Sequence, residues 1–352
     1  MNEHFQTRLQ LQLRAAAQRQ ERGGALTRLR LGLPGWPVVA AGALAALLLA
    51  AVVVVGGLRW GDEPVTAPHV VLVVPLADNL GTIDAGFGAV WMADTAKDRV
   101  LRVDPRTRRI QARVSVGAPS TVTAGAGAVW ALNEGGRLLR IDPATSRVTD
   151  RVALRLPGGG RLNGFDVQML GGVPWVIGAE GAMRINARDG HVEHFTRLTH
   201  RIEPFFVIAA EDSLWVVGRN QRLVRYDLAT GRREGDWPVP IRGSVGVTPT
   251  RAGPVYATHL GEVVRADPDD GRLAWRRKLG TGVTGIPYLR GSSLWIHASN
   301  AAGRDRLVEL DLASGRTRSS VVLPEFGASG VATVGRQLWI TTPNGKVMVL
   351  QR

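Results

Sequence analysis

The sequence predicts an all-β protein, a seven-bladed β-propeller of four-stranded antiparallel blades preceded by one transmembrane helix. Three observations in the 352 residues lead to this prediction. A short motif that ends in Trp or Tyr recurs seven times along the chain. Most repeats then contain a turn that starts with Asp or Asn, and an uncharged stretch of 21 residues lies before the first repeat.

The repeated motif is a small residue or a turn, followed by an apolar pair that ends in an aromatic side chain. Successive aromatics are 39, 45, 40, 41, 39 and 44 residues apart. A period of about forty residues with one such strand per unit is typical of propeller blades. Because a large flat ring can pack between neighbouring blades, we interpret these aromatics as structural. They are Trp91, Trp130, Trp175, Trp215, Tyr256, Trp295 and Trp339.

Each repeat has the same order of parts. An inner strand leads to the aromatic strand, then to a polar loop, and then to a third strand that ends in a turn. The first Asp or Asn of such a turn can accept hydrogen bonds from backbone N–H groups two residues on, and a later Gly can take a left-handed conformation. We therefore interpret these acids as hairpin residues and not as metal ligands. They are Asp104, Asp142, Asn186, Asp227, Asp267 and Asp311.

The two ends of the repeat region predict how the ring closes. The last repeat stops after its third strand, at residues 346–352, and lacks an outer strand. Residues 69–76 read as a strand that belongs to no repeat. Pairing these two segments completes a seventh blade and covers both strand edges, which would otherwise be sites of aggregation.

Composition excludes several classes of function. The chain has no cysteine, which rules out disulfides, cysteine-ligated zinc, iron–sulfur clusters and lipid anchoring through Cys. The net charge is +14, but no dense basic run is interleaved with aromatics. We therefore expect no binding of nucleic acid.

Residues 38–58 carry no charge and are rich in Ala, Leu and Val. As a helix they would span about 31 Å at about 1.5 Å per residue, which matches the hydrocarbon core of a bilayer. Four arginines from Arg19 to Arg30 precede this stretch, whereas Arg59 is the only close cation after it. The excess of positive charge before the stretch predicts that the N-terminus lies in the cytoplasm.

The expected domains are a basic cytoplasmic tail (1–35), a transmembrane helix (36–58), a linker (59–68) and an extracytoplasmic propeller (69–352). The protein is then a single-pass protein of the cell membrane, with its propeller extracellular or periplasmic. A cleaved signal peptide is one alternative, but its apolar region would be too long. A buried core helix is another, although it would not be flanked by Trp36 and Trp60 in this way.

The strand Gly-x-Val/Leu-Trp followed by Asp-Pro/Leu-x-Thr/Ser-Gly resembles the repeat of bacterial YVTN-type and NHL-like propellers, over residues 69–352. Residues 267–275 (DPDDGRLAW) are also similar to the repeat of pyrroloquinoline-quinone-type (PQQ-like) propellers. The resemblance implies a propeller that binds, scaffolds or catalyses. Because the quinone enzymes use eight blades and Cys or carboxylate contacts to the cofactor, we expect no cofactor here.

The streptogramin lyases are seven-bladed relatives of these propellers and supply the enzymatic alternative. Their chemistry needs a His base and a carboxylate-held Mg²⁺ close together on one face. His259 and Glu262, in a loop after the aromatic strand, are the nearest candidates in this sequence. No other catalytic residue is assigned.

Propeller ligands usually bind over the central channel, on the face formed by the loops after the second strand and by the connections between blades. Two segments, 156–164 and 298–305, depart furthest from the repeat, and insertions on one face often mark a binding surface. The candidate ligand-binding residues in or near such loops are Asp94, Glu134, Arg161, Arg201, Glu203, Phe205, His259 and Glu262.

His191 and His194 suggest a metal site at first sight. On an outer strand, however, residues three apart point to opposite faces, so the two imidazoles cannot share one ion. We therefore predict no metal site. The function that these features favour is binding, as a receptor, sensor or scaffold for a protein, a peptide or a cell-envelope ligand.

Overall fold

A computed structural model gives the structure of the protein and describes residues 68–198, 204–210, 212–218, 222–238, 244–248, 250, 252–258, 260–283, 287–299, 304–325 and 327–351. The described residues all belong to one compact unit, Thr66–Arg352. The predicted tail, transmembrane helix and most of the linker lie outside them. Within the described ranges, no helix is long and apolar enough to cross a membrane.

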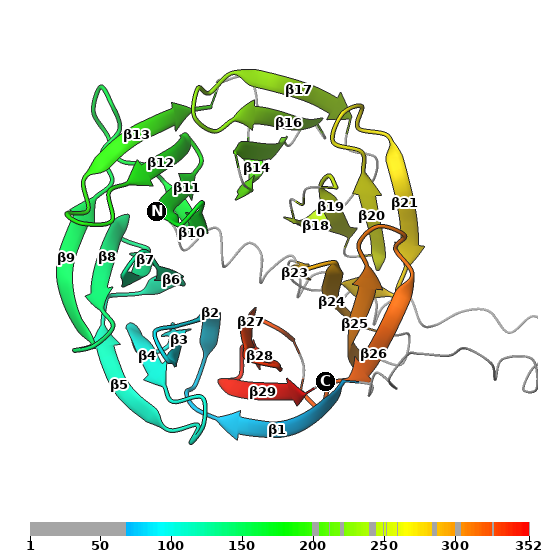
Figure 1. Cartoon of the computed structure of the whole chain (residues 1–352), viewed down its shortest axis with the longest axis horizontal. Coiled ribbons are helices and arrows are strands. Elements are labelled where there is room, and N and C mark those ends of the chain that lie inside the picture. Colours follow the sequence, from blue (N-terminus) through cyan, green and yellow to red (C-terminus); the bar gives the residue numbers. More distant parts are fainter. Residues whose placement is uncertain are drawn as a thin grey trace, which may run out of the picture. The chain divides into compact units, whose positions relative to one another are not determined.

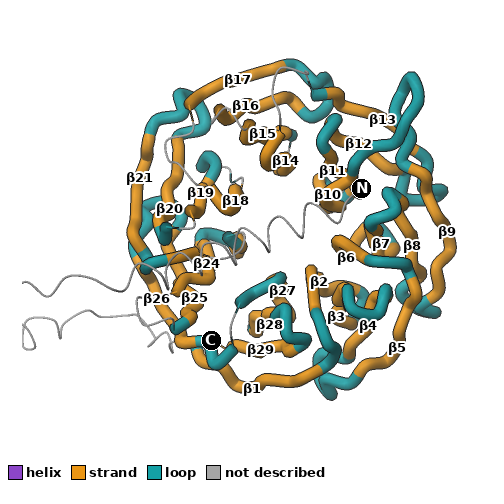
Figure 2. The backbone as a smooth tube through the Cα atoms, turned by 180° about the vertical axis from the view of Figure 1, so that it is seen from behind, coloured by secondary structure: helices purple, strands orange, loops and turns teal. Residues whose placement is uncertain are grey.

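The described residues form seven antiparallel sheets, which Figures 1 and 2 show as a ring around a central opening. Blades 1 to 4 are consecutive along the chain, and each has its strands in sequence order from the axis to the rim. Blade 1 comprises β2 (Leu80–Gly86), β3 (Ala89–Asp94), β4 (Arg99–Val103) and β5 (Ile110–Ser115). Blade 2 comprises β6 (Pro119–Gly125), β7 (Ala128–Asn133), β8 (Arg137–Asp142) and β9 (Arg147–Ala153). Blade 3 comprises β10 (Gly164–Leu170), β11 (Val173–Gly178), β12 (Gly181–Ile185) and β13 (Val192–Arg197). Blade 4 comprises β14 (Pro204–Ala210), β15 (Ser213–Gly218), β16 (Arg222–Asp227) and β17 (Arg233–Pro238).

The last three blades include two variations on this plan. Blade 5 comprises β18 (Ser244–Thr248), β19 (Val255–Thr258), β20 (Glu262–Ala266) and β21 (Leu273–Lys278). In blade 6, two short segments, β22 (Gly282–Val283) and β23 (Tyr288–Arg290), share the inner position beside β24 (Ser293–Ser299), followed by β25 (Asp305–Asp311) and β26 (Thr317–Val322). Blade 7 has β27 (Gly330–Val334), β28 (Gln337–Thr341) and β29 (Lys346–Gln351), with β1 (His69–Pro75) as its outer strand.

The ring closes as the sequence predicts. β1 pairs antiparallel with β29, from His69 opposite Gln351 to Pro75 opposite Lys346. The all-β, seven-bladed propeller of four-stranded antiparallel blades is thereby confirmed. Because the outermost strand of the last blade comes from the start of the propeller, the first and last segments of the ring hold each other in place.

The turns between the third and outer strands are built by the acids that the sequence singled out. Asp104, for example, accepts hydrogen bonds from the backbone N–H groups of Arg106 and Thr107 at 2.7 and 2.9 Å. Those bonds hold the pKa of Asp104 below its usual value. A later Gly, such as Gly190 (φ 74°) or Gly231 (φ 69°), takes the left-handed conformation in other turns of this type. These acids are therefore structural.

The hydrophobic core consists of seven clusters, and each cluster joins two neighbouring blades. Six tryptophans of the second strands are buried in them. Trp91, for instance, packs with Val129 and Ala131 of blade 2, and Trp339 packs with Leu80 and Met92 of blade 1. The repeated aromatic thus fills the junction with the following blade.

Tyr256 does not follow this rule and packs on the other side of its sheet. It packs with Trp215 at the junction with blade 4, on the preceding side. The position opposite the third-strand arginine is occupied in this blade by Val255, which faces Arg265. Trp275 of the outer strand β21 fills the junction with blade 6 instead. The reason is a shift of one residue along the strand, which moves a side chain to the other face.

Side chains of the inner strands also join neighbouring blades around the axis. Asp84 of β2 accepts hydrogen bonds from the hydroxyl of Thr123 and the backbone N–H of Ala124 in β6, at 2.9 and 2.8 Å. The hydroxyl of Thr341 in blade 7 donates to the carbonyl of Gly81 in blade 1 at 2.6 Å. These bonds satisfy polar groups near the channel and fix the spacing of the blades.

Candidate functional site

Consecutive hairpins of an antiparallel sheet lie at alternate ends, so the loops after the second strands and the connections between blades share one face. Glu134 is exposed in the turn after β7. Arg161 lies in the connection between β9 and β10, also exposed, and its guanidinium donates to the carbonyl of Gly135 at 3.5 Å. The structure therefore brings these two predicted residues together on this face.

Asp94 and Glu262 are less accessible than the sequence suggested. Asp94 is the last residue of β3 and is fully buried, with Oδ2 at 2.7 Å from Nε of Arg99. Its other oxygen accepts no hydrogen bond from the described residues. Glu262 is the first residue of β20 and is partly buried. Because its carboxylate is covered and paired, Asp94 is placed to hold the loop of blade 1 and not to meet a ligand at the surface.

The remaining predicted residues lie wholly or partly outside the described ranges. Arg201, Glu203 and His259 lie outside the described residues, and so does the side chain of Phe205, whose backbone belongs to β14. His191 is in a turn beside Asp189, with Nδ1 at 2.6 Å from Oδ1, whereas His194 contacts the ring of Trp175 edge-on. In the described part of the chain, no group of three or more His, Asp and Glu side chains could hold a metal ion.

Asp166 of the inner strand β10 is the acid with the most perturbed protonation. Burial raises the pKa of Asp166 to about 6, although hydrogen bonds from Gln168, Val167 and Thr121 act in the opposite direction. The folded protein therefore binds a proton more tightly at this carboxyl than the unfolded chain does. Folding stability from this group is greatest below about pH 4 and is lost as the pH rises through 6.

We expect Asp166→Asn to stabilise the propeller at pH 7.5 and to leave it nearly unchanged at pH 4. A rise of about two pKa units corresponds to roughly 3 kcal/mol, which is the upper limit of the gain. Urea unfolding at the two pH values measures it, with Asp150→Asn as the control, because Asp150 is on an outer strand and more exposed. Equal stability of Asp166→Asn and the unaltered protein at pH 7.5 would contradict the assignment.

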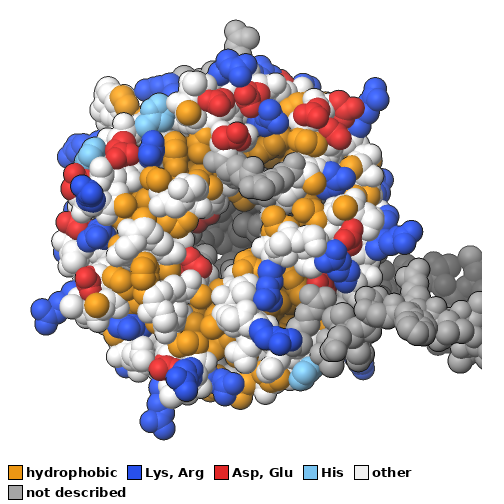
Figure 3. Space-filling view, in the orientation of Figure 1, with side chains coloured by type: hydrophobic (Ala, Val, Ile, Leu, Met, Phe, Trp, Pro, Cys, Tyr) orange, Lys and Arg blue, Asp and Glu red, His pale blue; other side chains and the backbone are white. Residues whose placement is uncertain are grey.

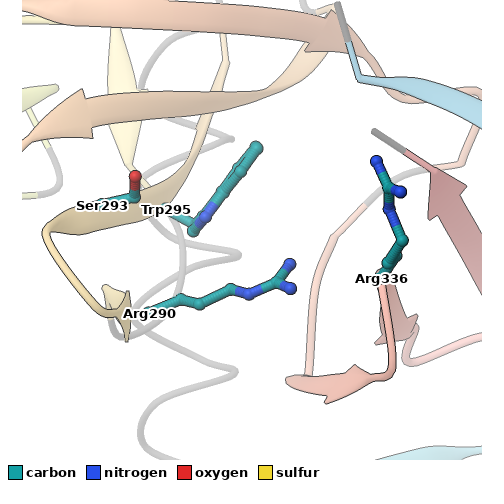
Figure 4. A pocket seen from close by; sticks show the side chains of 4 residues that line it. All are labelled: Arg290, Ser293, Trp295 and Arg336. Atoms are coloured by element: carbon teal, nitrogen blue, oxygen red, sulfur yellow. The ribbon is translucent and has the colours of Figure 1, made fainter. Parts of the chain in front are cut away.

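A cavity of about 210 Å³ lies on the opposite face of the ring, between blades 6 and 7, and is lined by Arg290, Ser293, Trp295 and Arg336. Arg290 and Ser293 flank the turn between β23 and β24, and Arg336 lies in the turn between β27 and β28. Figure 4 shows Arg290 extending toward the gap that separates Trp295 from Arg336. The arrangement offers hydrogen-bond donors and positive charge from two blades.

Sequence reasoning missed this cavity because it lies at the turns between first and second strands, which were treated as connections only. Two signals were present. An arginine stands in or near this turn in repeats five to seven, as Arg251, Arg290 and Arg336. In addition, Glu309 replaces the arginine that stands two residues before the first Asp or Asn of the turn in repeats one to five.

The face of the propeller in Figure 3 has apolar side chains around the central hollow and Lys and Arg scattered along the rim. The basic residues do not form a continuous stripe there.

Comparisons with known proteins add a partial family match. A family model described as outer membrane protein assembly factor BamB (PQQ_2) matches residues 236–352, from the end of blade 4 to the end of the chain. The match and the fold together support a PQQ-like propeller. No curated protein matches the sequence.

Three solved structures are similar in fold. A chain of the "Crystal Structure of Mitotic Checkpoint Complex" has a TM-score of 0.65 at 10% identity, covering 92% of this chain and 99% of that chain. The WD40 β-propeller domain of Doa1 has a TM-score of 0.65 at 9% identity, covering 82% and 97%. The computationally designed Ika8 protein has a TM-score of 0.58 at 11% identity, covering 78% and 83%. At these identities the likeness concerns the fold alone.

Proposed function

We propose that the chain is a single-pass membrane protein that displays its propeller outside the cytoplasmic membrane as a binding, sensor or scaffold module. Its ligand would be a protein, a peptide or a cell-envelope polymer. The uncharged residues 38–58 and the arginines before them support the anchor and its orientation.

The observation that carries the binding role is the match of residues 236–352 to a family described as an assembly factor of the outer membrane. The rest of the described chain has the same propeller architecture, with its turn acids and core aromatics used for structure. The loops at the two faces are therefore the parts of the propeller that we expect to contact a partner. Because loops on a rigid scaffold commonly carry recognition, we place the first contact at the face of Glu134 and Arg161.

A photo-crosslinking residue at Glu134 or Arg161 tests this role in the full-length protein in its own membranes. We expect each position to give one or a few specific adducts, several-fold more abundant than at Arg188. Arg188 is also an exposed residue with a long charged side chain, but it lies in a turn on the opposite face. Added protease should degrade the propeller in spheroplasts, which have no outer membrane, and leave the tail protected.

Two results would count against the proposal. The absence of adducts at Glu134 and Arg161, or the same adducts at all three positions, would contradict binding at this face. Protection of the propeller from protease in spheroplasts, together with digestion of the tail in inverted membrane vesicles, would contradict the orientation. Turnover of a substrate that His259→Ala abolishes would assign an enzyme instead.

A further inference from the structure

Blade 6 departs from a side-chain pairing that the first four blades share. In those blades the third-strand residue opposite the tryptophan is an arginine, as in Trp91 with Arg102 and Trp215 with Arg225. The guanidinium of Arg102 lies over the ring of Trp91, 5.5 Å from its centroid, and that of Arg225 is 5.7 Å from Trp215. The residue opposite Trp295 is Glu309, so the third strand of blade 6 places no arginine opposite this ring.

The Glu309 side chain is fully buried and engaged by blade 6. The hydroxyls of Ser293 and Ser319 both donate to its carboxylate at 2.6 Å. Arg318 donates to the Ser293 hydroxyl at 2.8 Å and also pairs with Asp311. The two acids beside the cavity are thereby bonded within blade 6, and Arg318 supplies a positive charge next to them.

Several hydrogen-bond donors of the residues that line the cavity have no acceptor among the described residues. The indole N–H of Trp91 donates to the carbonyl of Gly86 at 3.2 Å, whereas that of Trp295 has no acceptor among the described residues, although the side chain is only 2% exposed. Arg290 donates to the carbonyl of Gly335 at 3.2 Å but forms no ion pair with a described residue. Arg336 is exposed and has no hydrogen bond or ion pair with a described residue.

We propose that the cavity between blades 6 and 7 binds a carboxylate of a partner polypeptide, held by Arg290 and Arg336 over Trp295. This second site goes beyond the proposed binding at the Glu134 face and does not depend on it. Two guanidinium groups from different blades match the two oxygens of a carboxylate, and such charge-assisted bonds are stronger than neutral ones. The ring of Trp295 forms part of the cavity wall beside them.

The size of the cavity limits the ligand. Its volume of about 210 Å³ holds a carboxylate-bearing side chain or a chain terminus. Pockets for drug-sized molecules and cofactors have roughly 300–1,000 Å³. No carboxylate lines the cavity to bind an amine, because the nearby Glu309 is buried and bonded to Ser293 and Ser319. A short acidic group of a larger partner is the ligand that fits.

Fluorine NMR of the full-length protein in detergent, with 5-fluorotryptophan in place of Trp, tests the assignment. Trp295→Phe identifies the Trp295 resonance. The probes are acetyl-Gly-Glu-Gly-amide, which offers a side-chain carboxylate, and acetyl-Gly-Gly-Gly with a free C-terminus. We expect a saturable shift of the Trp295 signal with at least one of them, and the probe that gives it identifies the source of the carboxylate. For so small a probe the Kd should be in the millimolar range.

Arg336→Gln is the main variant, because Arg336 makes no contact that the fold requires. We expect it to weaken binding of the responding probe about fivefold, and Arg290→Gln with Arg336→Gln to weaken it at least about tenfold. Arg188→Gln, an exposed arginine in a blade 3 turn, should leave the affinity unchanged. The Trp295 signal of each variant in the absence of probe shows whether blade 6 is still folded.

Several outcomes would overturn the assignment. No saturable shift with either carboxylate probe is one, and an equal shift with acetyl-Gly-Gln-Gly-amide is another. A tighter response to inorganic phosphate than to both peptides would make this a phosphate site. Unchanged affinity in the folded double variant would remove Arg290 and Arg336 from the site. None of these results bears on crosslinking at Glu134, so the two proposals fail separately.

Discussion

A propeller that starts at Leu76 should fail to fold as a cooperative unit, whereas one that starts at Pro68 should unfold in a single transition. The difference between them is β1 (His69–Pro75), which pairs with β29 along its whole length. Val70 and Val73 pack on the junction of blades 6 and 7, and Leu72 packs on the junction of blades 7 and 1. Removal of β1 therefore weakens two junctions and exposes the edge of β29.

The expected loss is comparable with the total stability of a domain. Full burial of an aliphatic side chain contributes roughly 1.5–3 kcal/mol. Three partly buried ones leave with β1, together with its backbone pairing to β29. A typical domain is stable by about 5–15 kcal/mol in all. Circular dichroism during heating, together with gel filtration, measures the outcome. A protein starting at Leu76 that melts at the same temperature as the one starting at Pro68 would contradict ring closure by β1.

Asp305→Ala should destabilise the propeller by about 2–4 kcal/mol, because it leaves more than one buried hydrogen-bonding group without its partner, at about 1–3 kcal/mol each. Asp305 is the first residue of β25 and only 4% exposed. Its carboxylate accepts hydrogen bonds from the Ser299 hydroxyl at 2.6 Å and from the Gly327 N–H at 3.0 Å. Its Oδ2 also lies 3.0 Å from Nε2 of His297.

The physical reason for so large an effect is that Asp305 joins blade 6 to the connection that leads into blade 7. Without the carboxylate, the buried N–H of Gly327 loses its acceptor and cannot reach water. Urea unfolding measures the loss, and Asp305→Asn should recover part of it because an amide oxygen still accepts. Asp150→Ala is the matched control. Asp150 pairs with Arg140 at 3.6 Å on the outer part of blade 2, so its removal should cost less than about 1 kcal/mol. A similar loss in both Ala variants would refute the role of Asp305.

Most of the fold was predictable because its determinants are local and repeat. Each turn acid bonds backbone groups two or three residues away, as Asp142 does with Ala144 and Thr145. The spacing of six tryptophans and Tyr256 predicted the number of blades, and the strand at 69–76 that belongs to no repeat predicted the closure. Of the predicted binding residues, Glu134 and Arg161 lie together in exposed loops, whereas the burial of Asp94 depends on Arg99 five residues away in the next strand.

The sequence by itself determined the number of blades, the order of their strands and the use of its turn acids, because these depend on contacts within about ten residues. Only the tertiary structure decided that Arg290, Trp295 and Arg336 line one cavity, since these residues come from two blades. The same is true of the side of the sheet on which Tyr256 packs, which a shift of one residue reverses. Contacts between blades join residues about forty positions apart, and the repeat pattern of a single blade does not specify them.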